Sequence, residues 1–347
     1  MAERDDERTV LLTGATGFVG RHALPALRAA GWRVRCGARD PARAALRDPE
    51  SEWVRCDLDQ PATLATALTG CRAALYLVHG MGAGRSDYPA REQAEALAFR
   101  AAAEAAGVRR VVYLGGVAPQ GAPSKHLGSR LQTGEVLRGG ALSAIELRAG
   151  MVIGVGSAGW QVTCDLARRL PAMLLPRWLH NSSWPVAIED VVAALLLALE
   201  LELPGSAWFD LPGPERVTYK ELLRRVARAM GRRPLMIDVP ALSPRLSSYW
   251  IGLVTRADVS LARELVEGLR GDLDPSGPTL WSLAPAHRLR GLDEAIADAL
   301  RDEHLNETPG EELRERLVRL AREPLLVRPT PSPRGAGSLF PAGRQGC

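Results

Sequence analysis

Short apolar runs alternate with helical patterns through the first two thirds of the chain. Six of these runs have the apolar and β-branched residues of buried strands, at residues 10–13, 33–36, 53–56, 73–78, 110–114 and 144–147. Two helical patterns between them, 18–30 and 88–106, end at a glycine, which is a common helix C-cap. Strands that alternate with helices form parallel sheets. The pattern therefore predicts an α/β fold with a doubly wound, Rossmann-type parallel sheet.

The alternation changes after residue 148, where a glycine-rich turn leads into an insertion at the carboxyl edge of the sheet. Residues 207–211 resume the strand pattern and give a sheet of about seven strands. Helical spacing at 218–230 and 292–300 predicts a smaller, mostly helical C-terminal lobe. We therefore expect a sheet domain, a substrate lobe to which 155–185 also contributes, and a disordered tail rich in Pro, Gly and Arg, at residues 8–211, 212–305 and 324–347, respectively.

Charge and composition argue against several classes of protein. The chain has 44 Lys and Arg against 40 Asp and Glu, and its arginines are scattered, so we expect no nucleic-acid partner. The hydrophilic start is unlike a signal peptide, and the longest apolar run, 191–199, is shorter than the roughly 18 residues of a membrane span. Five cysteines without CxxC pairs predict no metal site. We expect a cytoplasmic protein without a membrane span.

The strongest chemical signal is Thr-Gly-Ala-Thr-Gly-Phe-Val-Gly at residues 13–20, which follows a strand and opens a helix. In this context Gly14 permits a tight turn, Gly17 lets the backbone approach a pyrophosphate, and Gly20 lets the helix pack closely on the strand. Backbone N–H groups at the helix start would point at the phosphates. The motif predicts a dinucleotide site formed by Gly14, Thr16, Gly17, Phe18, Val19 and Gly20.

The end of the second strand bears on which nicotinamide cofactor is used. Arg39 follows that strand and can form charge-assisted bonds with a 2′-phosphate, and Arg43 lies one helical turn further on. These residues favour NADP (NADPH) over NAD. Asp40 argues partly for NAD, because an acidic residue here binds the ribose hydroxyls, unless it caps the helix that begins at Pro41.

Further cofactor contacts are expected after the third and fourth strands. Asp57 and Leu58 would lie near the adenine, although a turn or N-cap role suits Asp57 equally well. Val78, His79 and Gly80 follow the fourth strand, at the edge where doubly wound sheets bind their ligands. We expect His79 to contact the ligand without acting as a catalyst, and a loop histidine with no role fits the sequence equally well.

Several segments together resemble the atypical and extended short-chain dehydrogenases/reductases, in the NmrA-like, NAD(P)H-binding branch related to nucleotide-sugar epimerases. They are 13–20, Arg39-Asp40-Pro41, Asp57-Leu58, 147–154 and 186–191. The resemblance covers about residues 8–305. It implies that the segment after the sixth strand, including Met151, passes beside the nicotinamide. It also implies that residues 155–185 and 212–305 determine the substrate.

The chain departs from this family at the catalytic residues. Active members usually carry a Tyr, a Lys four residues later and a Ser at the end of the fifth strand, and the Tyr exchanges a proton while hydride moves. Here glycine replaces the serine, and His126 and Arg130 stand where Tyr and Lys are expected. His126 is a candidate acid/base because imidazole titrates near neutrality, with Arg130 orienting the cofactor ribose. Alternatively, both are ordinary polar residues of a helix near the cofactor.

Two functions follow from these alternatives. The first is an NAD(P)H-dependent oxidoreductase or epimerase-like enzyme that transfers hydride to or from a small carbonyl, quinone or similar small-molecule substrate. The second is a catalytically silent, dinucleotide-binding redox sensor or scaffold that binds a protein partner. A nucleotide-sugar enzyme would need a basic pocket for a diphosphate, for which Arg232 and Arg233 hardly suffice.

Overall fold

Seven parallel strands form a central sheet in the computed structural model, which describes residues 8–78, 88–239, 264 and 266–306. The strands are β1 (Thr9–Leu12), β2 (Arg33–Ala38), β3 (Glu52–Arg55), β4 (Ala73–Tyr76), β5 (Arg110–Gly116), β6 (Ser143–Ala149) and β11 (Ala207–Leu211). They lie in the order β3-β2-β1-β4-β5-β6-β11, and all neighbouring pairs are parallel. The predicted doubly wound α/β sheet is therefore confirmed.

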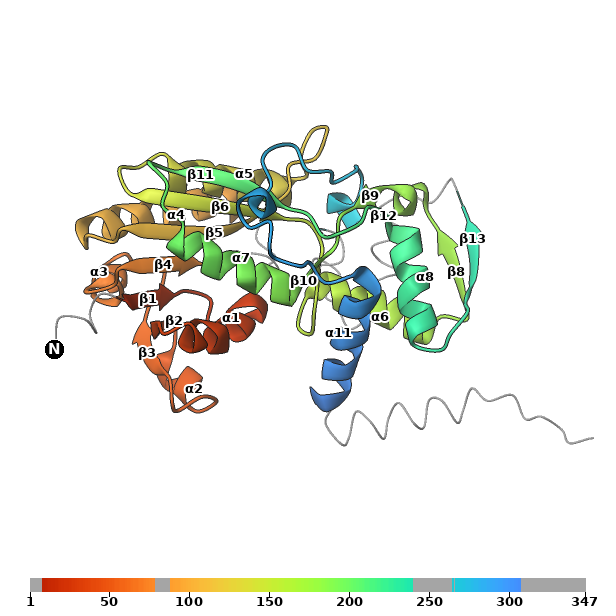
Figure 1. The fold of residues 1–347 in the computed structure, drawn as a ribbon, viewed down its shortest axis with the longest axis horizontal. Coiled ribbons are helices and arrows are strands. Elements are labelled where there is room, and N and C mark those ends of the chain that lie inside the picture. The colour runs from red at the N-terminus through yellow and green to blue at the C-terminus, as the bar shows by residue number, and fades with distance from the viewer. Residues whose placement is uncertain (1–7, 79–87, 240–263, 265, 307–347) are drawn as a thin grey trace, which may run out of the picture. The chain divides into compact units, whose positions relative to one another are not determined.

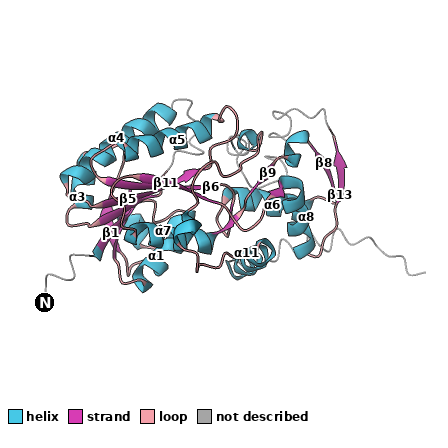
Figure 2. Ribbon diagram, turned by 45° about the horizontal axis from the view of Figure 1, so that its top comes forward, coloured by secondary structure: helices cyan, strands magenta, loops and turns pink. Residues whose placement is uncertain are grey.

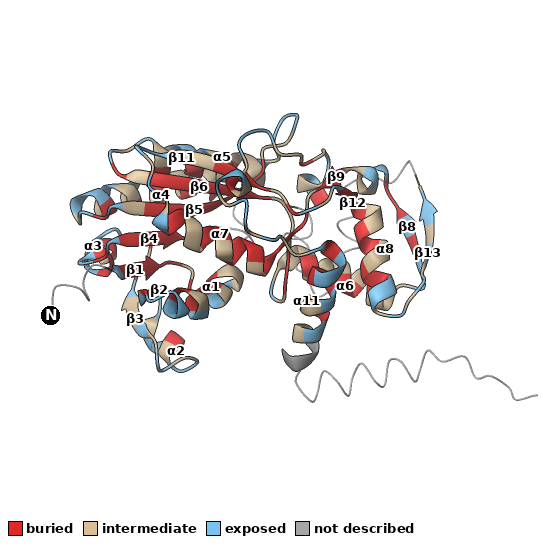
Figure 3. Cartoon of the chain, in the orientation of Figure 1, coloured by how far each residue is buried: buried red, intermediate tan, exposed pale blue. Residues whose placement is uncertain are grey.

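Helices cover both faces of this sheet (Figures 1 and 2). Side chains alternate along a strand, so Val10 and Leu12 of β1 face α1 (Phe18–Ala29) and α7 (Ile188–Glu200), whereas Leu11 faces the opposite way. The helices that share the core around Leu11 are α3 (Ala62–Leu68), α4 (Tyr88–Ala105) and α5 (Lys125–Arg138). The short helix α2 (Pro41–Ala45) follows β2. Figure 3 shows the buried strands between these two layers.

The strand order reverses between β1 and β4. From β1 the chain moves outward through β2 and β3, then returns to β4 and continues outward on the other side through β5 and β6. Connections that leave in opposite directions open a crevice at the carboxyl ends of the two strands, which is where doubly wound sheets bind ligands. The glycine-rich turn that follows β1 therefore lies at the reversal point.

A second hydrophobic core joins α6 (Ala158–Arg169), α8 (Tyr219–Ala229) and α11 (Leu292–Asn306). The side chain of Thr218 caps α8 by accepting a hydrogen bond from the Glu221 N–H at 3.1 Å. Three two-stranded sheets that the sequence did not predict accompany these helices. They are β7 (Val152–Ile153) with β10 (Val186–Ala187), β8 (Ala172–Leu175) with β13 (Leu235–Asp238), and β9 (Ser182–Ser183) with β12 (Val217–Thr218). Two short 3₁₀ helices, η3 (Arg177–His180) and η4 (Leu280–Leu283), complete the described elements.

Residues 272–274 are fastened to the strand pair β9–β12 by polar contacts. Asp272 Oδ1 accepts a hydrogen bond from the Ser182 N–H at 2.6 Å, and Asp274 accepts one from Trp184 Nε1 at 3.0 Å. Arg216 donates two further bonds to Asp274, at 2.7 and 3.0 Å. These contacts hold the neighbouring side chain of Leu273 in place beside the cavity described below.

A buried ion cluster fixes α5 to the sheet. Glu146 on β6 is 1% exposed and lies 2.9 Å from both Arg138 Nε of α5 and Arg148 Nε of its own strand. The guanidinium of Arg148 also stacks 3.9 Å from the ring centroid of Trp208 on β11. Gly134 makes room for this arrangement, because a Cβ there would lie 2.3 Å from the Glu146 carboxyl carbon. The cluster therefore sets the position of the helix that carries His126.

Neither a membrane-spanning helix nor a metal-binding cluster occurs among the described residues. No helix in the described ranges is long and apolar enough to cross a membrane. Nor do three or more His, Cys, Asp or Glu side chains gather into a metal-binding group in that part of the chain. The expected disordered tail at 324–347 lies outside the described residues.

Candidate functional site

The turn between β1 and α1 is shaped by two close backbone approaches. Gly14 has φ +66°, and a Cβ there would lie 2.8 Å from the carbonyl oxygen of Leu77, which follows β4. A Cβ on Gly20 would lie 2.3 Å from the carbonyl oxygen of Gly14. Thr13 ties the two strand ends together, since its hydroxyl donates to the Leu75 carbonyl at 2.9 Å and accepts from the Leu77 N–H at 3.0 Å. Only glycine fits at these two positions without moving the backbone.

The N-terminus of α1 is suited to an anion. Gly17 is the N-cap residue, makes no side-chain capping bond, and is followed by a first turn without acidic residues. The first N–H groups of a helix have no partner within the helix and carry partial positive charge. A pyrophosphate placed against this turn would meet those N–H groups and, because Gly14 and Gly17 lack side chains, could approach the backbone closely. The turn therefore fits a dinucleotide.

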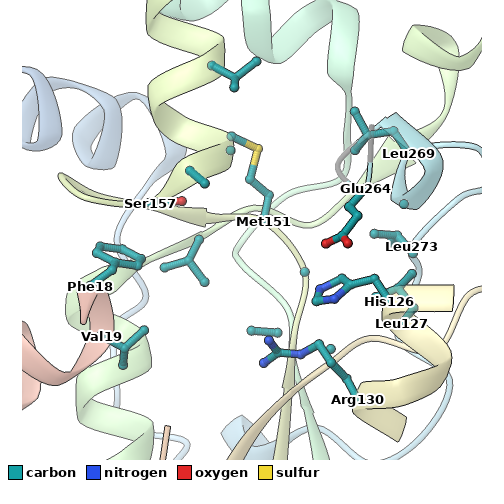
Figure 4. A pocket seen from close by; sticks show the side chains of 18 of the residues that line it. Phe18, Val19, His126, Leu127, Arg130, Met151, Ser157, Glu264, Leu269 and Leu273 are labelled. Carbon is teal, nitrogen blue, oxygen red and sulfur yellow. The ribbon is translucent and has the colours of Figure 1, made fainter. Parts of the chain in front are cut away.

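One cavity of about 590 Å³ brings many of the predicted site residues together (Figure 4). Those that line it are Gly14, Thr16, Gly17, Phe18, Val19, Gly20, Val78, His126, Arg130 and Met151. Figure 4 shows Phe18 and Val19 on one side of the cavity and His126 and Arg130 on the other, with Met151 above and between them. The expected contacts His79 and Gly80 lie outside the described residues.

Three predicted cofactor residues do not line this cavity. Arg39 follows β2 and is exposed. Asp57 Oδ1 accepts a hydrogen bond from the Asp59 N–H at 3.3 Å, and Leu58 is buried in the core around Leu11.

Asp40 caps α2. Its carboxylate accepts a hydrogen bond from the Arg43 N–H at 3.0 Å, and Pro41 occupies the first helical position. The capping alternative considered for Asp40 is therefore the one that the structure adopts. Arg39 and Arg43 are both exposed at this strand end.

His126 and Arg130 lie one turn apart on α5, whose N-cap Ser124 accepts a hydrogen bond from the Leu127 N–H at 3.3 Å. Arg130 Nη2 donates to the carbonyl of Leu114 on β5, and Tyr113 OH donates to the Arg130 carbonyl at 3.2 Å. These bonds fix the first half of α5 over the end of β5. A Cβ on Gly116 would lie 3.0 Å from the Leu127 side chain. Glycine at this end of β5, where the family has a serine, therefore lets α5 approach the strand closely.

Glu264 also lines the cavity, and sequence reasoning missed it. Figure 4 shows its carboxylate pointing toward the imidazole of His126. Burial raises the pKa of this carboxyl, and the negative charges of Glu92 and Glu267 raise it further. No motif surrounds Glu264 in the sequence. Its place in the site depends on how its segment packs against α4 and α5, which no local pattern reveals.

The part of the cavity away from the glycine-rich turn is apolar. Its walls come from α5, α6, η3, α8 and the residues around 270. The apolar side chains are Leu127, Val162, Leu166, Trp178, Leu179, Leu222, Leu223, Val266, Leu269 and Leu273. A ligand in this space would therefore be held mainly by the burial of apolar surface, with its polar groups restricted to the end near His126 and Arg130.

Known proteins resemble this chain along most of its length. Residues 14–138 match the model of a family described as NAD(P)H-binding. A curated relative, the ceramide reductase of Caulobacter vibrioides, is 28% identical over 290 residues, which are 81% of this chain and 90% of the relative. Its sequence therefore extends the similarity well beyond the matched family region.

Solved structures share the fold. The triphenylmethane reductase of Citrobacter sp., complexed with NADP(H), matches with a TM-score of 0.68 and 18% identity over 84% of this chain and 99% of that chain. The NADPH-dependent quinone oxidoreductase of Escherichia coli, complexed with NADPH, has a TM-score of 0.66 and 20% identity, covering 83% and 99%. At these identities the likeness establishes the architecture.

Proposed function

We propose that this chain, which resembles the NAD(P)H-binding, atypical branch of the short-chain dehydrogenases/reductases, is an NADPH-dependent reductase of apolar carbonyl compounds. One observation carries the proposal. A single cavity joins the glycine-rich turn, the His126 and Arg130 side chains on α5 and an extended apolar wall. This combination suits a hydride acceptor whose reactive carbonyl is polar and whose remainder is apolar.

The cofactor preference rests on the end of β2. Arg39 is exposed directly after this strand, and Asp40 is engaged in capping α2. A guanidinium forms charge-assisted bonds with a phosphate, whereas NADH offers only ribose hydroxyls at this point. Arg39 therefore favours NADPH, and the turn at Gly14–Gly20 holds the pyrophosphate. When bound, the reduced nicotinamide supplies the hydride.

His126 supplies the proton in this proposal. The product alcohol needs a proton on its oxygen, and the family's tyrosine is replaced here by an imidazole, which titrates near neutral pH. Arg130 donates a hydrogen bond to the Leu114 carbonyl. Its role is to orient the substrate oxygen or the cofactor ribose beside His126.

The substrate class follows from the apolar wall. A volume of about 590 Å³ lies within the range of small-molecule sites, and the described lining beyond His126 is mostly apolar, with Glu264, Thr163 and Tyr219 as polar exceptions. The ceramide reductase relative acts, by its name, on a lipid. We therefore place a ketone or quinone with a long or bulky apolar group ahead of short polar aldehydes or nucleotide sugars.

Turnover of a substrate panel tests the proposal. Purified protein is mixed with NADPH and a long-chain ketone, a hydrophobic quinone or a short polar aldehyde, and the loss of reduced nicotinamide is followed by absorbance. We expect the apolar compounds to have the higher kcat/KM. His126→Gln should lower kcat about 100-fold or more without weakening NADPH binding. Gln132→Ala, at an exposed position of the same helix, is the matched control and should leave kcat unchanged.

The silent redox sensor is the competing function. It is favoured by the absence of the family's tyrosine and by the bond that already holds Arg130 to β5. Tight NADPH binding with no oxidation by any compound of the panel would support the sensor and contradict the reductase.

A further inference from the structure

Glu264 occupies an unusual position for a carboxylate. It stands in the wall of a largely apolar cavity, and Figure 4 shows it aimed at the imidazole of His126. Its Oε2 is enclosed and has no hydrogen-bond partner among the residues that the structure describes. An enclosed carboxylate oxygen is costly unless a proton or a cation accompanies it. The group that faces it is the imidazole of His126, which becomes a cation when it takes up a proton.

The charges around Glu264 come from three elements. They are those of Glu92 on α4, Lys125, His126 and Arg130 on α5, and Glu267 on the same segment as Glu264, and the neutral phenol of Tyr88 on α4 lies near them. Glu92 is buried and accepts a hydrogen bond from Ser129, so its position is fixed. Burial first, then Glu92 and Glu267, raise the pKa of the Glu264 carboxyl, while Lys125 opposes them with the smallest effect. Several negative charges thus lie near His126, and they favour the protonated form of its imidazole.

We propose that Glu264 is a positioning residue for His126, holding the imidazole in its protonated form and turned toward the substrate oxygen. The inference rests on the proposed reductase function. In the family, a cationic lysine adjusts the pKa of the tyrosine that donates the proton. Here the anionic Glu264 would adjust the pKa of the His126 imidazolium instead.

The proton transfer balances without a further reactant. As the cofactor's hydride pair forms the new C–H bond, the C=O π bond breaks and its electron pair takes the proton from the His126 imidazolium to form the O–H bond. The imidazole is left neutral beside the Glu264 carboxylate. A proton from solvent restores the imidazolium before the next turnover.

The test compares pH dependences in Glu264→Gln, Glu264→Asp and the control Glu267→Gln. An opposite charge nearby favours the protonated imidazole, so we expect Glu264→Gln to lower the alkaline pKa of the kcat/KM profile by about one pH unit or more. At alkaline pH this is about a tenfold loss of activity, whereas activity at acid pH is kept. Glu264→Asp should restore part of the shift. Glu267 is exposed, so its replacement should shift the profile far less.

A titration of His126 by NMR provides a readout that does not need turnover. We expect the midpoint of the imidazole titration to fall in Glu264→Gln relative to the unchanged protein, with NADPH affinity retained as evidence of correct folding. An unchanged midpoint would overturn the inference whether or not the enzyme is active. The midpoint could also shift in a protein that fails to oxidise NADPH with every compound of the panel. That result would support the pairing of Glu264 with His126 and contradict the reductase function.

Discussion

Gly20→Ala tests whether the turn before α1 is the cofactor site. The added Cβ would lie 2.3 Å from the Gly14 carbonyl oxygen and 2.8 Å from the Ala15 Cα. Both of these are backbone atoms that cannot rotate away. Since ordinary Cβ contacts begin near 3.4 Å, helix and turn must separate by more than 1 Å.

The size of the effect follows from this displacement. Overpacking a tight contact costs about 1–3 kcal/mol, and replacing a helical glycine by alanine returns about 0.5–1 kcal/mol. We therefore expect the free energy of unfolding to fall by about 0.5–2 kcal/mol. A hydrogen bond to a charged group contributes about 1.5–3 kcal/mol, so losing one phosphate contact should weaken NADPH binding about tenfold to a hundredfold.

Fluorescence titration with NADPH and urea unfolding of the same samples measure both quantities. Gly128→Ala is the matched control, because a Cβ there meets only Pro123 side-chain atoms, at 3.7 and 4.0 Å. It should raise the free energy of unfolding by about 0.5–1 kcal/mol and leave the affinity for NADPH unchanged. If Gly20→Ala is folded and binds NADPH as tightly as the unchanged protein, the phosphates do not bind at this turn.

Three further outcomes are expected. Arg39→Gln should weaken NADPH binding about tenfold to a hundredfold and leave NADH binding unchanged in parallel titrations. Equal effects on both cofactors would contradict a contact between Arg39 and the 2′-phosphate. Glu146→Gln should lower the free energy of unfolding measured in urea by about 3–5 kcal/mol, because it leaves the buried Arg148 without its carboxylate, and a loss below about 1 kcal/mol would refute the importance of the ion cluster. Because the pKa of Glu264 is raised, the folded protein binds the proton of this carboxyl more tightly than the unfolded chain does. The resulting contribution to stability is fully present below the pKa of 4.5 in the unfolded chain, and it is lost as the pH rises through the folded pKa. Glu264→Gln should therefore be more stable than the unchanged protein at about pH 8 and lose that advantage at about pH 4, and a pH-independent difference between the two urea midpoints would contradict the assignment.

The sheet was predictable because its signals are local. The central strands β1 and β4 are continuous runs of mostly apolar residues, and the helical patterns 18–30 and 88–106 end at a glycine. The turn at Gly14–Gly20 needs glycine at position 20 because of contacts within a few residues. The three small two-stranded sheets gave no such signal. β7, β9, β10 and β12 are two residues long, and their pairing is decided by distant partners, as when Ser182 meets Asp272.

The candidate site divides in the same way. The glycine-rich turn and the capping role of Asp40 follow from neighbouring residues. The placement of His126 and Met151 in one cavity required the fold, whereas the spacing along α5 already placed His126 and Arg130 on one face of the helix. Glu264 was missed because a single carboxylate among leucines and valines looks like a solvated residue until α4 and α5 are packed around it.

Calorimetric titration of the purified chain with NADPH tests the central claim most directly. The account predicts one binding site per chain with a dissociation constant below about 100 μM, and weaker binding of NADH. A titration that shows no binding of either nucleotide at about 1 mM would contradict it.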